Sequence, residues 1–365
     1  MAASDLRDAD GGFFRYATRR DWTVPHYERM LTDNAQLLEV ALDAGDEETV
    51  RGIARFLLGT LRRKDGGFGA AQDSESWIDG ARSEGGYYLR PVAERAALEP
   101  PAVDGKVITG WNGLAIAALA RAGAALGEDV WIAAAAEAAA AVLGTNRGAD
   151  GALVRASLDG RASAAVATAA DLALLADGLF ALAAATGDVA PAVTGRDLLD
   201  EVLDGAAGDD PLLRAQGIAA SPDHTDGDLP SDTAAVAQAA LSAWRLGAGD
   251  RYRAAAAARV EALASRALAQ PFAHGSLLRV AAGLAAAPRQ LVVVTEDAGG
   301  ALAAAARGAD ADVVAVVTPA QAAAFAASGF ELFEGKEATA ERAYDCRAFV
   351  CRLPVSDPAA VSRAR

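Results

Sequence analysis

Asp10-Gly11-Gly12-Phe13 and Asp65-Gly66-Gly67-Phe68 are two copies of one tetrapeptide, and their recurrence decides the fold. A weaker copy follows as Asp150-Gly151-Ala152-Leu153, and a further decayed copy as Asp209-Asp210-Pro211-Leu212. Helical patterns lie between the copies. Repetition of this kind is typical of an architecture built from repeated supersecondary units.

A second signal, a glycine followed by an acidic residue, divides the helical segments into pairs. The glycine supplies a left-handed helix end, and the acid sits at the positive end of the following helix. The short links make each pair an antiparallel hairpin. The signal occurs at Gly45-Asp46, Gly127-Glu128, Gly187-Asp188 and Gly249-Asp250, and we predict helices at 26–44, 47–63, 111–126, 129–147, 167–186, 188–204, 231–247, 250–269 and 275–287.

These hairpins predict a mostly α protein, an (α/α)6-type toroid that is complete or open, with a small α/β segment at its C-terminal end. We place the toroid at 1–287 and the α/β segment at 288–365, because strand-like runs at 290–295, 312–318 and 344–353 alternate with short helices. That alternation predicts a parallel sheet. The polar loops 64–90, 148–163 and 205–230 should emerge at one end of the ring, where we expect a site.

Composition limits the partners. A net charge of −15 argues against nucleic acid and against an anionic membrane surface. Charged residues interrupt the alanine-rich runs, so we expect no membrane span, and the charged start lacks the apolar core of a signal peptide. We therefore expect a cytoplasmic protein.

Cys346 and Cys351 are the two cysteines. In one extended strand their odd separation would place them on opposite faces and too far apart for a disulfide. We expect both to be reduced, since a bonded pair would require a tight turn at Ala348. We expect no metal and no cofactor.

The first candidate cluster is Thr23-Val24-Pro25-His26-Tyr27-Glu28-Arg29-Met30. Proline suits the first turn of a helix, so His26 and Glu28 should lie in that turn, with Asp33 on the stripe of His26. A histidine that titrates near neutrality suits proton transfer. The alternative is a histidine that caps or packs.

The second cluster is the acidic loop 69–76 with the segment 84–88. Asp73 and Glu75 are catalytic candidates beside His26 and Glu28, because carboxylates with flanking aromatic rings are typical of sugar sites. The alternative is a solvated, turn-rich loop. We assign substrate binding to Arg15, Tyr16, Glu84 and Tyr87.

The third cluster, Thr109-Gly110-Trp111-Asn112-Gly113, places a tryptophan and an amide at a helix start. Trp111 and Asn112 are candidates for stacking on and hydrogen bonding to a sugar. A helix cap with a core tryptophan accounts for them nearly as well. Asp171, at the inner start of another helix, is a weaker substrate-binding candidate.

Three ordered motifs carry a resemblance to a known family. They are 24–31 (VPHYERML), 109–114 (TGWNGL) and 344–351 (YDCRAFVC). They resemble the thioredoxin-domain-containing family of the spermatogenesis-associated type. The resemblance implies a six-hairpin glycosidase-like (α/α)6 barrel, similar to the N-acylglucosamine 2-epimerases.

The chain also departs from that pattern. The family has a thioredoxin-like domain and a helical pair before the Gly-Gly-Phe motif, whereas this chain begins almost at that motif and has no Cys-x-x-Cys. We therefore expect an open ring, a partner or second copy that covers its edge, or a fragment. Gln72 stands where the family tends to have Glu. Ala170 stands where it tends to have an acid, and Thr233 where it tends to have Asn.

Three functions remain open. The leading one is a sugar epimerase or isomerase in which His26 transfers a proton. The second is a glycoside hydrolase that uses two carboxyl groups, drawn from Asp73, Glu75, Glu84 and Asp171. The third is a non-catalytic binding or assembly protein with a degenerate toroid.

Overall fold

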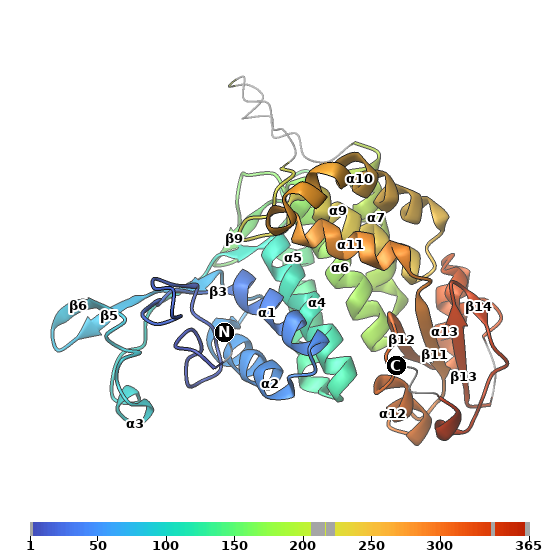
Figure 1. The fold of residues 1–365 in the computed structure, drawn as a ribbon, viewed down its shortest axis with the longest axis horizontal. Coiled ribbons are helices and arrows are strands. Elements are labelled where there is room, and N and C mark those ends of the chain that lie inside the picture. The colour runs from blue at the N-terminus through green and yellow to red at the C-terminus, as the bar shows by residue number, and fades with distance from the viewer. Residues whose placement is uncertain (1–2, 206–215, 217–222, 337–339, 362–365) are drawn as a thin grey trace.

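The computed structural model describes residues 3–205, 216, 223–336 and 340–361. Helices dominate, and consecutive helices form antiparallel hairpins in two layers (Figure 1). The inner layer consists of α1 (Leu31–Asp43), α4 (Thr109–Leu126), α6 (Ala169–Thr186), α9 (Asp232–Arg245) and α11 (Gly275–Ala285). The outer layer consists of α2 (Glu47–Phe56), α5 (Asp129–Thr145), α7 (Val189–Leu203) and α10 (Asp250–Ala269). The expected α/α toroid fold class is confirmed.

Three of the four glycine–acid signals separate two helices as expected, whereas α9 ends at Arg245, four residues before Gly249. Gly127 and Gly187 cap their helices at a φ of +71°, a left-handed conformation that glycine adopts without strain. The side chains of Asp46 and Asp188 accept hydrogen bonds from the backbone N–H groups of Thr49 and Ala190. These three hairpin turns are therefore encoded locally.

The first helix begins at Leu31, and the expected start at residue 26 is wrong. His26 belongs to the short strand β2 (Pro25–His26), which pairs with β1 (Tyr16–Ala17), and Arg29 belongs to β3 (Arg29–Met30). Val24 has a φ of +53°, which turns the chain into this hairpin. Since neither His26 nor Glu28 is helical, Asp33 does not share a helical stripe with His26.

In two copies of the repeated tetrapeptide, the backbone of the phenylalanine is bonded by an asparagine side chain in the same way. The side-chain oxygen of Asn34 accepts the Phe13 N–H at 2.8 Å, and its amide donates to the Phe13 carbonyl at 3.0 Å. Asn112 makes the same pair of bonds to Phe68, at 2.8 and 3.1 Å. The third copy lacks the asparagine, and the fourth, 209–212, lies outside the described residues.

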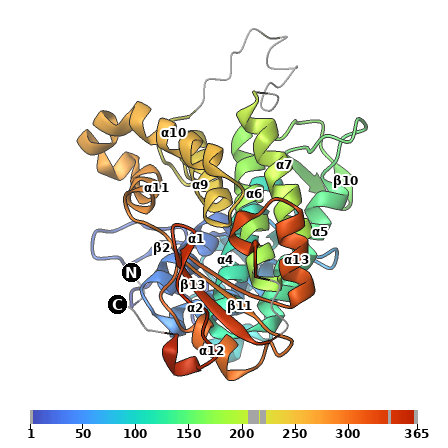
Figure 2. The ribbon, with the colours of Figure 1, turned by 90° about the vertical axis from the view of Figure 1, so that its right-hand side faces the viewer.

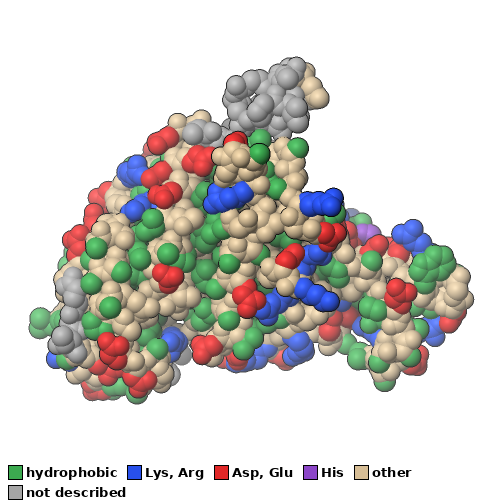
Figure 3. Space-filling view, turned by 180° about the vertical axis from the view of Figure 1, so that it is seen from behind, with side chains coloured by type: hydrophobic (Ala, Val, Ile, Leu, Met, Phe, Trp, Pro, Cys, Tyr) green, Lys and Arg blue, Asp and Glu red, His purple; other side chains and the backbone are tan. Residues whose placement is uncertain are grey.

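Short strands and one further helix connect the helices at the loop end. Two of the strands, β5 and β6, form an arm that projects away from the ring (Figure 1). Apolar side chains gather near its tip, and acidic and basic side chains are interspersed over the same face of the molecule (Figure 3). The connecting elements are β4 (Ala71–Gln72), β5 (Glu75–Ile78), β6 (Ala81–Glu84), α3 (Val92–Arg95), β7 (Val103–Asp104), β8 (Val107–Ile108), β9 (Ala156–Leu158) and β10 (Arg161–Ala162).

The C-terminal segment forms a sheet in the order β12-β11-β13-β14 (Figure 2). Its elements are β11 (Arg289–Val294), α12 (Ala301–Arg307), β12 (Val313–Val317), α13 (Pro319–Ala327), β13 (Arg342–Arg347) and β14 (Val350–Cys351). The expected strands at 290–295 and 312–318 are present, whereas the expected strand at 344–353 is a hairpin of two strands. The sheet is mixed: β11 and β12 are parallel, whereas β13 runs antiparallel to β11. The expectation of a parallel sheet holds for that one pair alone.

Cys346 and Cys351 form a disulfide, and the expectation of two reduced cysteines is wrong. They do not lie in one strand: a turn at Ala348 and Phe349, both at positive φ, folds the segment into the β13–β14 hairpin. The two cysteines become directly opposite partners with their Cα atoms 3.8 Å apart. Disulfides are rare in a reducing cytosol, and the cytoplasmic location stays a prediction.

Helix α6 is the one described helix that is long and apolar enough to cross a membrane. Its apolar window is 72% buried inside the fold, as in the core helix of a packed domain. The first and last inner helices, α1 and α11, are joined by Arg279, which pairs with Glu39 at 3.1 Å and with Asp43 at 3.2 Å. This contact links the two ends of the inner layer.

Candidate functional site at the loop end of the ring

The structure gathers four of the expected site residues around a fifth, His26. Its Nδ1 atom lies 3.0 Å from Oε1 of Glu84, and its Nε2 atom lies 3.7 Å from Oε2 of Glu28. The ring of Tyr16 stacks on the imidazole with centroids 5.0 Å apart. Arg15 donates to Glu28 at 2.8 Å. We call His26, Glu28, Glu84, Arg15 and Tyr16 the His26 cluster.

Two acids border the His26 cluster. Asp228 accepts a hydrogen bond from Arg15 at 2.6 Å. Asp33, in the first turn of α1, has a buried Oδ2 atom that accepts no hydrogen bond from the described residues. Burial, with the negative charges of Asp228 and Glu28, raises the pKa of Asp33 to about 6. Asp33 therefore changes protonation near neutral pH.

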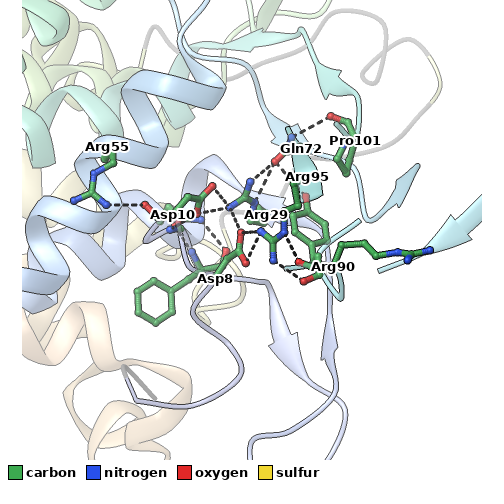
Figure 4. A network of polar contacts seen from close by, with 12 residues as sticks. Asp8, Asp10, Arg29, Arg55, Gln72, Arg90, Arg95 and Pro101 are labelled. Carbon is green, nitrogen blue, oxygen red and sulfur yellow. Dashed lines mark hydrogen bonds and ion pairs between the residues drawn. The ribbon is translucent and has the colours of Figure 1, made fainter. Parts of the chain in front are cut away.

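A buried ion-pair network holds the base of the cluster (Figure 4). Arg29, next to Glu28 in sequence, pairs with Asp10 at 2.6 Å and with Asp8 at 3.4 Å, and its guanidinium lies 4.2 Å from the centroid of the Phe56 ring. Arg95 pairs with Asp8 at 2.8 Å. The network ties the N-terminal segment to β3 and to the loop before β7, which fixes the chain on either side of His26.

Gln72 completes this network. Its side-chain oxygen accepts from Nε of Arg29 at 3.1 Å, and its amide donates to the Pro101 carbonyl at 3.0 Å (Figure 4). A glutamate here would place a third carboxylate on a guanidinium that already has two, and it could not donate to a carbonyl. The neutral residue therefore suits the network.

The other two expected catalytic residues lie on or beside the arm. Asp73 is exposed, and its carboxylate accepts the backbone N–H of Glu75 at 3.1 Å. Glu75 pairs with Arg82 and stands directly across the arm from Glu84. Within the described residues neither acid forms a hydrogen bond or ion pair with His26, so their catalytic roles stay predictions.

Tyr87 and Trp111 are partly buried beside the core. The Tyr87 ring lies edge-on to that of Tyr88 at 5.3 Å, with the guanidinium of Arg95 5.5 Å from its centroid. The Trp111 indole N–H is buried without a hydrogen-bond partner among the described residues. Because that N–H group is buried, it gives no support for sugar binding, and the substrate-binding role of Trp111 stays a prediction.

Asn112 and Asp171 are engaged by the fold. The amide of Asn112 bonds the backbone of Phe68 and Ile108, and the side chain is fully buried. Asp171 forms a reciprocal capping box with Thr168 and pairs with Arg155 at 3.1 Å. The hydrogen bonds and the ion pair occupy both side chains within the fold. Substrate binding by Asn112 or Asp171 therefore stays a prediction.

Among the described residues, no group of three or more His, Cys, Asp or Glu is placed to hold a metal ion. The other two histidines lie outside the cluster: His224 bonds Thr233 at 2.8 Å, and His274 is buried before α11 with its Nδ1 atom 3.0 Å from the Gln270 carbonyl. The cluster therefore offers carboxylates, a guanidinium and one imidazole.

Asp228 has no signal in the sequence that marks it as a site residue, and Asp33 has only a weak one. Asp228 is 213 positions from Arg15, in a loop with no motif, so only the tertiary fold brings it near. Asp33 carried a usable signal: it is the acid in the first turn of α1, on a helix whose neighbouring residues are buried.

No family model matches the sequence. Over 115 residues the chain is 39% identical to spermatogenesis-associated protein 20 of Mus musculus and 41% identical to that of Homo sapiens. Each match takes in 29% of this chain and 15% of the relative, so the homology concerns a part of that protein. The resemblance identified from the motifs is confirmed.

Solved structures with a similar fold include carbohydrate enzymes. A sugar epimerase from a ruminal bacterium is 14% identical with a TM-score of 0.46, over 71% of this chain and 81% of that one. A cellobiose 2-epimerase from Bacillus thermoamylovorans is 10% identical with a TM-score of 0.47, over 70% of this chain and 67% of that one. These similarities concern the fold.

Proposed function

We propose that the chain is a sugar epimerase- or isomerase-like enzyme that transfers a proton at the His26 cluster. The observation that carries the proposal is the position of the His26 imidazole between two carboxylates, with Glu84 at 3.0 Å on one nitrogen and Glu28 at 3.7 Å from the other. A carboxylate at Nδ1 fixes the ring and favours the tautomer whose Nε2 is free to accept a proton.

The reaction needs an imidazole base beside a carbon that is acidified by a neighbouring carbonyl, as in an open-chain sugar. Nε2 of His26 would take the proton. Asp33, with a pKa raised to about 6, would be the second group that gains and loses a proton near neutrality. Epimerisation requires such a second group on the other face of the carbon.

The cluster also has groups that suit a polyol. The Tyr16 ring is 51% exposed and can stack on the apolar face of a sugar while it orients His26. Glu84 is half-exposed and has lone pairs left for hydroxyl groups. Arg15 holds Glu28 and Asp228 in place, which keeps their carboxylates directed toward the cluster.

The test is the melting temperature of the chain with a panel of free sugars and oligosaccharides. A ligand at about 100 times its Kd stabilises the folded state by about 2.7 kcal/mol. We expect one class of free sugar to raise Tm, the shift to vanish in His26→Ala, and the shift to persist in the control His224→Ala.

Three outcomes would contradict the proposal. Absence of a shift with every sugar would favour the non-catalytic binding or assembly protein. A shift that His26→Ala leaves intact would move the site elsewhere. Release of reducing ends from an oligosaccharide, without conversion of any free sugar, would favour the glycoside hydrolase.

A further inference from the structure

A cavity of about 670 Å³ lies at the end of the ring opposite the His26 cluster. The C-terminal halves of the inner helices line it, and the segment around β12 covers one side. Arg121 faces it from α4, ten positions after Trp111, so the cavity lies about 15 Å along the helix from the loop end. The cavity is thus separate from the His26 cluster.

Positive side chains dominate the charged lining of this cavity. Six arginines and three aspartates line it, although the whole chain carries a net charge of −15. Three acids that pair with these arginines, Glu39, Asp177 and Asp345, stand outside the lining. The lining therefore has twice as many arginines as acids, because several of the acids that pair with these arginines are not part of it. The arginines are Arg121, Arg245, Arg279, Arg289, Arg307 and Arg347.

Arg245 has an unused donor at this site. Its Nη2 atom pairs with Asp312 at 2.7 Å, but its Nε atom is buried and has no hydrogen-bond partner among the described residues. Burial and the neighbouring charges of Arg121 and Arg279 lower the pKa of Arg245. A buried donor without an acceptor is costly, and an anionic oxygen would satisfy it.

Two more guanidinium groups are held in place beside it. Glu39 binds both, with one carboxylate oxygen on Arg121 and the other 3.1 Å from Arg279. Asp177 fixes Arg121 from the other side at 2.8 Å and itself accepts from Ser242. Arginines that are fixed before a ligand arrives lose little side-chain entropy on binding.

We propose that this cavity binds a small molecule that carries an oxyanion group, either a phosphate or a carboxylate. The arginine fork matches both groups. Phe180 and Leu241 supply an apolar wall for the body of the molecule, and the volume is that of a small-ligand pocket. The site does not depend on the function of the His26 cluster.

Calorimetric titration of the whole chain tests the proposal with three probes: glucose 6-phosphate, glucuronate and neutral glucose. We expect one of the two anions to bind. We expect Arg245→Gln and Arg347→Gln each to weaken that binding about tenfold or more, because each removes a charged donor. The control Arg161→Gln, an exposed arginine on β10, should bind as the unmodified chain does.

The phosphate and carboxylate probes tell the two sources of the oxyanion apart. Failure of both anions to bind at millimolar concentration would overturn the proposal. So would binding that His26→Ala abolishes while both arginine variants retain it, since the anion would then occupy the His26 cluster. If Arg245→Gln does not fold, Arg347→Gln decides, because Arg347 is exposed and pairs with no acid in the described part of the chain.

Discussion

The Nδ1 atom of His26 lies 3.0 Å from the Oε1 atom of Glu84, although 58 positions separate the two residues. His26 comes from a short hairpin before α1, and Glu84 from the base of the arm, where β6 ends. The contact therefore depends on the packing of the N-terminal segment against the loop between α2 and α4. Arg29 and its buried partners provide that packing.

Arg29→Met should destabilise the fold by roughly 3–5 kcal/mol, because it leaves Asp10 and Gln72 without their buried partner. Denaturant unfolding measures the loss. The matched control is Arg55→Met, since Arg55 is exposed and, among the described residues, donates only to the Asp10 carbonyl at 3.3 Å. This variant should cost less than about 1 kcal/mol. Equal losses in the two variants would contradict the structural role given to Arg29.

Asn34→Ala and Asn112→Ala should each cost about 2 kcal/mol, because each leaves a buried N–H and a buried carbonyl of the repeated tetrapeptide unsatisfied. Thermal or denaturant unfolding gives both values. Similar losses are expected because the two asparagines make equivalent bonds. A loss below about 0.5 kcal/mol in either variant would show that the bonds contribute little.

Asp33 should make stability fall as pH rises. Its pKa is raised from 3.8 to about 6 in the folded state, so the folded state binds more protons than the unfolded state between these values. The free energy of unfolding should therefore drop by roughly 2 kcal/mol from pH 4 to pH 7. Asp33→Asn should remove this component of the pH profile.

Asp228→Asn serves as the companion variant. The charge of Asp228 raises the pKa of Asp33, so its removal should move the fall in stability to lower pH without abolishing it. A pH profile that neither variant alters would show that Asp33 titrates normally.

Reduction of Cys346–Cys351 should cost about 2 kcal/mol or less, because the bond closes a loop with a sequence separation of only five. Unfolding with and without a thiol reductant measures the effect. Cys351→Ser should show the same loss and no response to the reductant. Reductant sensitivity that persists in Cys351→Ser would refute the pairing.

Much of the helical fold could be predicted because its signals are local. Gly127 and Gly187 end their helices in a left-handed backbone conformation, and Asp46 and Asp188 cap the N-termini of the helices that follow them. Both signals can be recognised from a few neighbouring residues. Alanine-rich helices between such marks pack in pairs. The strands of the C-terminal sheet were also recognisable from their runs of valine.

What could not be predicted depended on contacts between distant segments. A proline at position 25 suits a helix start, but pairing of Pro25–His26 with Tyr16–Ala17 made it a strand. The Cys346–Cys351 bond followed from a turn at Ala348 and Phe349 that no glycine marks, and the direction of β13 followed from its antiparallel pairing with β11. The amide of Asn112 was expected to face a ligand, yet it bonds the backbone of a loop 44 positions away.

The most direct test of the proposed chemistry is exchange with solvent deuterium. The chain is incubated with the stabilising free sugar in heavy water, and NMR follows the hydrogen on the carbon beside the carbonyl. A proton transferred by His26 should be replaced by deuterium, and His26→Ala should abolish the exchange while His224→Ala retains it. Binding of the sugar without any exchange, or equal exchange in His26→Ala, would contradict proton transfer at the His26 cluster.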